Sequence, residues 1–265
     1  MYIASLHRYP IKGCRGHSLD RVDLDHLGMR DDRRLMLVNA GGRFLSQREL
    51  PALATIAPQL EGDTLTVECG NATPLRLALH AGGAAREVTI WGSRTIAEDQ
   101  GDAAAAWFSN VLHTPVRLVR WGAASERGID STYSPRSDAQ TAFTDGYPVL
   151  VTLEASLADL NARLAAPIPM DRFRPNIVVS GGNAWDEDQW GALRVGGMTF
   201  DAVKPCARCV VPSTDQQSGV RLAPQEPLRT LATFRTIPKL GAIFGQNLVH
   251  RRPGSVAVGD PVAPM

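Results

Sequence analysis

The chain has 265 residues, of which 44% are hydrophobic, enough to bury the core of one large domain or of two smaller ones. Its 28 basic and 27 acidic residues leave a formal net charge of +1, which argues against a general attraction to nucleic acid or an anionic membrane. Four cysteines are too few for a disulfide scaffold, and no window reaches the roughly 18 apolar residues of a membrane-spanning helix. Because the first residues also lack a long apolar run, we expect a soluble protein of the reducing cytoplasm.

The first hundred residues show the patterns of strands and turns. Residues 33–47 contain two apolar runs separated by a pair of glycines, which predicts a β-hairpin. Apolar and polar residues alternate over 61–70 and again over 86–92, as in half-buried strands. The closely spaced prolines and glycines between these segments are typical of barrels and sandwiches. We therefore predict a mainly β fold of the barrel type with a few helices.

Helical periodicity occurs in three segments. Residues 101–113 are rich in alanine and end before Pro115, residues 154–165 place leucines at i, i+3 and i+7, and residues 226–235 give a weaker pattern. Further strands are predicted in the rest of the chain, at 175–181, 198–203, 246–251 and 255–262.

A polar segment without clear periodicity, residues 121–143, predicts a long loop of the kind that lines or closes a functional site. We place the boundary between an N-terminal β region and a C-terminal, β-rich catalytic region near this loop. The predicted domains are residues 1–118 and 119–265.

Two of the four cysteines, Cys206 and Cys209, form a Cys-x-x-Cys pair. A structural zinc site needs four ligands, and neither the other cysteines (Cys14 and Cys69) nor the six histidines supply a second pair. A thioredoxin-like dithiol should precede a helix, whereas the residues after Cys209 are β-branched or proline. An inert buried pair leaves the charges of Lys204, Arg208 and Asp215 unexplained. A fourth possibility is a single thiolate ligand to a metal delivered by a cofactor, with Arg208 favouring the ionised thiol.

Five blocks of sequence, in this order, resemble MOSC-domain proteins: YPIKGCRG at 9–16, FRPNIVVSG at 173–181, CARCVVPSTDQQSG at 206–219, FGQN at 244–247 and VGDPV at 258–262. The chain is similar to the mitochondrial amidoxime-reducing component and its bacterial relatives, and more distantly to the C-terminal domain of molybdenum cofactor sulfurase. The resemblance spans essentially the whole chain. It implies an N-terminal MOSC β-barrel domain followed by a MOSC domain.

The resemblance also implies a cofactor, Mo-molybdopterin, in which a pyranopterin dithiolene holds one molybdenum. Cys209 would be the catalytic residue and the protein's ligand to molybdenum, whereas Cys206 would not bind the metal. The implied cofactor-binding residues are Lys12, Gly13, Arg30, Asp145, Gly146, Tyr147, Arg174, Asn176, Ala207, Arg208 and Asn247.

Two of these positions have alternative interpretations. Arg30 is equally consistent with a surface charge beside Asp31 and Asp32. For Arg174 the alternative is a salt bridge to Asp171, and we favour cofactor binding. Because Pro175 follows it, we expect Arg174 to be extended and to project on the same side as Asn176.

Three further positions depart from the pattern of close relatives, which have Ser where this chain has Gly13 and Ala207, and Tyr where it has Asn247. Side-chain donors to the cofactor are therefore fewer.

The implied activity is the reduction of small N-hydroxylated compounds by removal of an oxygen atom at molybdenum. The chain lacks the run of cluster-binding cysteines that some bacterial relatives carry, so we expect electrons from a separate ferredoxin- or flavin-type reductase. We expect neither a nucleic acid nor a membrane partner. The alternative is a sulfur-carrier or cofactor-binding module, in which Cys206 and Cys209 act as a persulfide and its resolving thiol.

Overall fold

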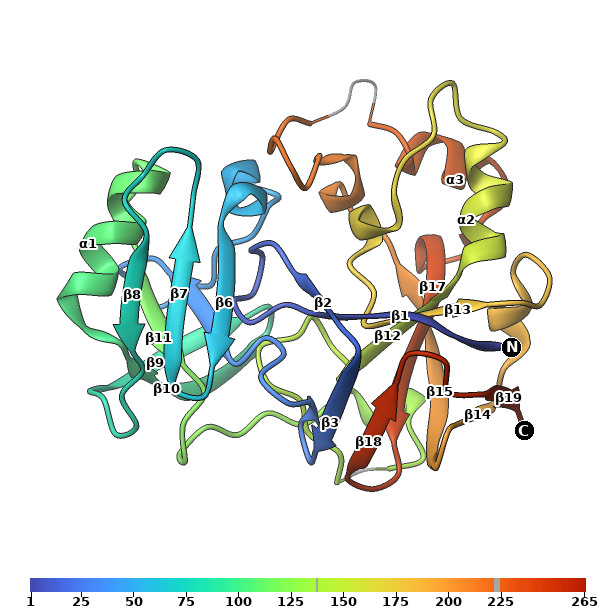
Figure 1. The fold of residues 1–265 in the computed structure, drawn as a ribbon, viewed down its shortest axis with the longest axis horizontal. Helices are drawn as coiled ribbons and strands as arrows, with labels where there is room; N and C mark the ends of the chain where they lie inside the picture. The colour runs from blue at the N-terminus through green and yellow to red at the C-terminus, as the bar shows by residue number, and fades with distance from the viewer. Residues whose placement is uncertain (137, 222–224) are drawn as a thin grey trace.

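The structure is a computed structural model that describes residues 1–136, 138–221 and 225–265. Figure 1 shows β6–β8 and α1 on the left, and β12–β15, β17–β19, α2 and α3 on the right. The three helices are α1 (Gly101–Leu112), α2 (Glu154–Asn161) and α3 (Leu228–Phe234). Among the described residues, none of the helices has the length and apolar character needed to cross a membrane. The mainly β prediction is confirmed.

The N-terminal part contains two small antiparallel sheets. The first has the order β5-β11-β10-β9 and the second β6-β7-β8. Their bounds are β5 (Leu35–Val38), β6 (Ala57–Glu61), β7 (Thr64–Glu68), β8 (Leu75–Ala78), β9 (Ala85–Ile90), β10 (Ser93–Asp99) and β11 (Arg117–Arg120). The predicted hairpin is confirmed, since Val38 pairs with Phe44 across the two glycines. Alternation is also confirmed, because the apolar residues of β7 and β9 are buried.

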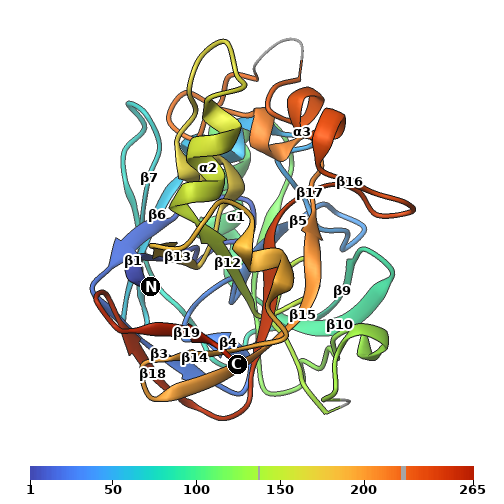
Figure 2. The ribbon, with the colours of Figure 1, turned by 90° about the vertical axis from the view of Figure 1, so that its right-hand side faces the viewer.

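A nine-stranded sheet forms the other part, with the order β19-β14-β15-β17-β12-β13-β1-β2 and with β16 paired to β17. Its bounds are β1 (Tyr2–Arg8), β2 (His17–Leu19), β12 (Val149–Leu153), β13 (Ile177–Ser180), β14 (Ala192–Val195), β15 (Met198–Ala207), β16 (Thr236–Ile237), β17 (Gly241–His250) and β19 (Val262–Pro264). A third small sheet joins β18 (Gly254–Ala257), β3 (Arg21–Asp25) and β4 (Gly28–Met29). Figure 2 shows β3, β14, β18 and β19 gathered at the base of this part.

Two of the first four strands, β1 and β3, pair with strands from the later part of the chain. Strand β1 lies between β13 and β2, and β3 pairs with β18. Their apolar side chains complete one core: Ile3 and Leu6 pack in the same buried cluster as Val179, Phe200 and Leu248. Strand pairing therefore connects the segment before residue 118 with the segment after it.

Prolines, a left-handed residue and a side-chain hydrogen bond account for where the helices begin or end. Helix α1 stops at His113, which takes the left-handed conformation just before Pro115, as predicted. Helix α2 ends at Asn161, earlier than predicted, because the Asn161 amide bonds to both the N–H and the C=O of Ile168 and reverses the chain. Helix α3 lies within the predicted segment and follows Pro227. Residues 121–143 form no named strand in the part that the structure describes, which leaves out Ser137.

Candidate functional site

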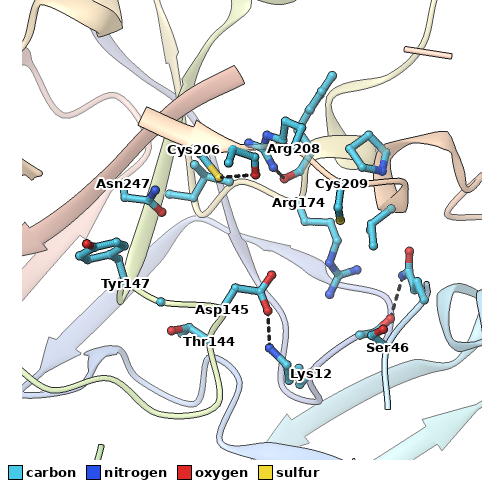
Figure 3. Close-up of a pocket in the computed structure, with 18 of the residues that line it drawn as sticks. Lys12, Ser46, Thr144, Asp145, Tyr147, Arg174, Cys206, Arg208, Cys209 and Asn247 are labelled. Carbon is cyan, nitrogen blue, oxygen red and sulfur yellow. Dashed lines mark hydrogen bonds and ion pairs between the residues drawn. The ribbon is translucent and has the colours of Figure 1, made fainter. Parts of the chain in front are cut away.

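A cavity of about 410 Å³ opens between the N-terminal part and the nine-stranded sheet. It is lined by turns that follow β1 and β5, by the β9–β10 turn, by the segment before β12, by the end of β15 and by Asn247 of β17. Every residue that the sequence assigned to the cofactor lines it except Arg30, and Cys209 lines it too. Figure 3 shows Asp145, Arg174 and Cys209 directed toward the same space. The motifs, far apart in sequence, thus meet in one pocket.

The two cysteines lie where β15 ends. Cys206 is on the strand, and Cys209 follows it on the turn that leads to a 3-10 helix at Val211–Ser213. Both are free thiols, and burial raises the pKa of Cys206 although the positive charge of Arg208 opposes the shift. Among the described residues, no group of three or more His, Cys, Asp or Glu side chains is placed to hold a metal ion. The pair therefore gains no further protein ligands from this neighbourhood.

Arg208 holds the cysteine turn in place. Its Nε and Nη2 donate to the carbonyl of Phe244 at 2.9 and 2.6 Å, and its Nη1 donates to the carbonyl of Phe173 at 3.0 Å. These two phenylalanines stack with ring centroids 3.8 Å apart. The guanidinium therefore fixes the Cys-x-x-Cys turn against β17.

An ion pair joins the two sides of the pocket floor. Lys12 Nζ lies 2.5 Å from Asp145 Oδ1, with 7% of the lysine side chain and 78% of the aspartate side chain exposed. Burial lowers the pKa of Lys12, an effect that the Asp145 charge partly reverses. Desolvation acts to raise the pKa of Asp145, but the Lys12 ammonium outweighs it and holds that pKa well below its usual range. Asp145 is therefore a carboxylate at neutral pH.

Arg174 adopts a conformation that the sequence analysis did not predict. Its φ is 55° and its ψ is 45°, in the left-handed region, so the expected extended conformation is wrong. Pro175 disfavours only the right-handed region, and the left-handed conformation lets the Arg174 N–H bond to the carbonyl of Asp171. Its side chain stacks 4.3 Å from the centroid of Tyr9, and its buried Nη2 has no partner among the described residues.

Arg33, rather than Arg30, reaches the pocket. Arg30 is exposed and does not line the cavity, whereas Arg33 lines it and donates to Asp32, to Asn176 Oδ1 and to the carbonyl of Arg174. The left-handed conformation of Arg33, with φ 47°, turns the chain at this point. The Asn176 side chain makes two further contacts, because its Oδ1 also accepts from Leu150 N and its Nδ2 donates to the carbonyl of His7.

A pair of buried glutamines connects the two sides and supports Arg174. Gln47 and Gln216 exchange two hydrogen bonds of 3.0 Å, and Gln216 Oε1 also accepts from Arg174 Nη1 at 3.1 Å. Gln47 Nε2 donates to the carbonyl of Gly13 at 2.7 Å. Neither glutamine was predicted from sequence, although Gln216 lies inside the quoted CARCVVPSTDQQSG block.

Three other predicted residues line the pocket in different surroundings. Asn247 lies on β17, where its Nδ2 donates to the carbonyl of Lys204. The Tyr147 hydroxyl donates to the carbonyl of Asp130, and burial raises the pKa of Tyr147 to about 12. Ala207 is exposed at the end of β15.

In the part of the loop 121–143 that the structure describes, which leaves out Ser137, no residue lines the cavity, so the expected lining role is wrong there, and closure over the site stays a prediction. Buried Arg127 anchors the loop by donating to the carbonyls of Ala142, Thr144 and Asp145, and Tyr133 of the loop contacts the cavity-lining Lys204. Other lining residues carry no motif in the sequence. They include Ser46, Arg48, Trp91, Arg172 and Lys204. Trp91 falls within the segment 86–92 that the sequence predicts as a strand, whereas the structure places it in the turn between β9 and β10, so no local signal indicated a site there.

Two domain families match the chain: the MOSC N-terminal beta barrel domain over residues 1–115 and the MOSC domain over residues 138–263. The human mitochondrial amidoxime-reducing component 1 is 33% identical over 278 residues, which covers 98% of this chain and 82% of the human protein. This chain belongs to the MOSC family. The resemblance carried by the five sequence blocks is confirmed.

Two other proteins are similar to this MOSC protein. Molybdenum cofactor sulfurase of Oryza sativa subsp. japonica is 32% identical over 256 residues, which covers 89% of this chain and 31% of the rice protein. The solved structure of YuaD from Bacillus subtilis covers 98% of this chain and 93% of its own, with 12% identity and a TM-score of 0.44. The name of the rice protein refers to the molybdenum cofactor, and the similarity covers 31% of that protein's length.

The pocket of this MOSC protein fits an anionic cofactor with a sulfur-liganded metal. Among the described residues, seven cationic side chains line it against a single carboxylate, that of Asp145. These cations are Lys12, Arg33, Arg48, Arg172, Arg174, Lys204 and Arg208. The unpartnered Nη2 of buried Arg174 provides a donor suited to a phosphate or a pterin edge. Cys206 and Cys209 supply soft sulfur in the same wall.

Proposed function

We propose that this MOSC protein binds Mo-molybdopterin in the pocket, with Cys209 as the ligand to molybdenum, and reduces N-hydroxylated compounds. The observation that carries the proposal is the position of Cys209 in the wall of a pocket with seven cations and one carboxylate. A thiolate suits a metal already bound by sulfur, and the cations offset the charge of a phosphate and a dithiolene. When bound, the molybdenum centre supplies the two-electron reduction of the N–O bond.

The chain's own residues bind and orient. Arg174 offers its free Nη2 to the cofactor, and Arg208 fixes the turn that presents Cys209. Asp145 stays ionised at neutral pH, so it accepts hydrogen bonds from a pterin and is not the proton donor. Lys12 holds Asp145 in that state from its buried position.

The proposal includes the other components of the reaction. The substrate is a small N-hydroxylated compound, in keeping with the amidoxime-reducing relatives that the chain resembles over 98% of its length. A separate ferredoxin- or flavin-type reductase supplies the electrons. We propose the cytoplasm as the location.

A second candidate is a persulfide carrier, which the presence of both cysteines in one wall favours. In that function a persulfide on one cysteine is attacked by the thiolate of the other. Because burial raises the pKa of Cys206, the thiolate form of Cys206 is disfavoured, and this weighs against the resolving role.

The test is elemental analysis of protein purified from a host that makes molybdopterin, with molybdenum and zinc counted per chain. We expect about one molybdenum per chain in the wild type and in Cys206→Ser, and none in Cys209→Ser. Reduction of an amidoxime with an artificial electron donor should follow the molybdenum content. Equal loss of metal in both variants would refute Cys209 as the specific ligand, and zinc in place of molybdenum would refute the cofactor.

A further inference from the structure

Two exposed aromatic rings near the pocket each hold a cation. Trp91, in the turn between β9 and β10, is 40% exposed, and the guanidinium carbon of Arg48 lies 4.4 Å from its ring centroid. Tyr133 is 46% exposed, and Lys204 Nζ lies 3.9 Å from its ring centroid. Arg48, Trp91 and Lys204 line the cavity. We call Arg48 and Lys204 the rim cations.

The rim cations differ from the deeper ones in their partners. Lys12 pairs with Asp145, and Arg172 pairs with Asp215. By contrast, the guanidinium of Arg48 and the ammonium of Lys204 form no hydrogen bond or ion pair with any residue that the structure describes. Glu49, the acid next to Arg48, is instead bound by both terminal nitrogens of Arg43.

Stacking on an aromatic face fixes a guanidinium without using its N–H groups. The ring attracts the cation through its π-electrons, while the N–H edge stays free for a bidentate anion. Trp91 is itself held in place, because its Nε1 lies 3.4 Å from Asp145 Oδ1 and its ring packs 4.6 Å from that of Phe44. Arg48 therefore has its donors free on a positioned support at the edge of the pocket.

The depth of each cation separates two uses of positive charge. Lys12, Arg172 and Arg174 are buried, as suits residues that hold a cofactor away from water, whereas Arg48 is exposed and Lys204 is half-buried. We propose that the rim cations form a subsite for a carboxylate or phosphate carried by the substrate, so that this protein prefers anionic N-hydroxylated compounds to neutral ones. The inference rests on the proposed reductase function and names its substrate class.

The experiment compares two amidoximes that differ in one charge: benzamidoxime and the same compound with a para-carboxylate. In the wild type we expect a lower KM for the carboxylate compound, and a KM for it that rises with ionic strength. Arg48→Gln should raise the ratio of the two KM values, anionic over neutral, about tenfold, with little change in kcat for the anionic compound. Lys204→Gln should act in the same direction.

The matched control is Arg43→Gln. Arg43 is also an exposed arginine of this segment, but it pairs with Glu49 and does not line the cavity, so its loss should leave the KM ratio unchanged. Two readouts do not need turnover. Molybdenum content per chain should be the same in Arg48→Gln as in the wild type, and calorimetry should show benzoate binding the loaded protein more tightly than benzamide, by a margin that Arg48→Gln removes.

The outcomes separate the subsite from the reaction. Loss of molybdenum in Arg48→Gln would assign this cation to the cofactor's phosphate and overturn the subsite. Equal KM ratios in the wild type and Arg48→Gln would also overturn it, while leaving the reductase function intact. If neither amidoxime is reduced but benzoate binding still depends on Arg48, the reaction is refuted and the anion site stands.

Discussion

Replacing Gln216 with alanine should lower stability more than an ordinary polar truncation. The Gln216 side chain is buried and makes four hydrogen bonds, two with Gln47, one with Arg174 and one with the carbonyl of Thr214. After truncation, Gln47 Oε1 loses its donor and Arg174 Nη1 loses its acceptor, beside an Nη2 that already lacks one among the described residues. Each of these two buried polar groups left unpaired costs about 1–3 kcal/mol, so the free energy of unfolding should fall by about 2–6 kcal/mol.

The assay is thermal unfolding of the cofactor-free protein by calorimetry. For a chain of this size the loss corresponds to a fall in Tm of roughly 4–24 °C. The control is Gln217→Ala, one position along, where the exposed side chain makes no hydrogen bond to a described residue, and we expect a change within about 0.5 kcal/mol. If Gln216→Ala and Gln217→Ala have the same Tm, the hydrogen bonds between Gln47 and Gln216 contribute nothing measurable to stability and the reasoning is wrong. Molybdenum content should fall as well, since Arg174 loses its support.

Two further predictions concern a buried acid and a tight glycine. Glu187 is fully buried, accepts from Ser156 Oγ at 2.7 Å, and burial raises its pKa from 4.5 to about 7. Because the folded-state pKa is the higher one, stability from this group is complete below about pH 4.5 and is lost as pH rises through about 7, in total about 3 kcal/mol. Glu187→Gln should flatten the dependence of Tm on pH between 5 and 8, and curves parallel to the wild type would contradict the assignment. Gly245, with φ +77°, leaves no room for a Cβ, which would lie 2.6 Å from the carbonyl oxygen of Val151. Gly245→Ala should therefore cost more than about 2 kcal/mol in urea unfolding, whereas Gly62→Ala, with φ +56° and open space, should cost about 1 kcal/mol. Equal losses in the two glycine variants would show that the contact with Val151 can relax.

Patterns of short range predicted the local elements well. The glycine pair at 41–42 gives a hairpin, and the alternation around Leu65 and Val67 gives a strand with both side chains buried. Helix α1 ends where Pro115 indicates. These features depend on residues within a few positions of one another, so one sequence is enough to find them.

Features decided by distant contacts were not predictable in the same way. Asp31 and Arg33 both take left-handed conformations, and these turn the chain so that Arg33 enters the pocket. Neither residue type favours such a turn as strongly as glycine, so the sequence did not indicate which arginine would do so. The conformation of Arg174 was wrong for a related reason, because a rule about Pro175 excludes one region and does not choose between the other two.

The pocket likewise contains residues that the sequence predicted and residues that only distant contacts bring there. The resemblance to the MOSC family predicted that Lys12, Asp145, Arg174 and Cys209 belong to one site, and all four line the pocket. Arg48 and Trp91 belong to no motif, and they reach the pocket only because the β9–β10 turn lies against the segment after Phe44. Residues that recognise one particular substrate are of this second kind, since relatives with other substrates need not share them.

The placement of β1 has a consequence for how the protein is made. His7 is synthesised well before Asn176, which follows 169 positions later and whose Nδ2 binds the His7 carbonyl. Gln47 and Gln216 are separated by the same 169 positions. At about 5–20 residues per second, each early partner waits roughly 8–34 s for the late one. Meanwhile Ile3 and Leu6, fully buried in the finished fold, have no sheet to cover them. The nascent chain should therefore depend on chaperones until β13 emerges, and the pocket cannot accept a cofactor before synthesis has passed the cysteine pair.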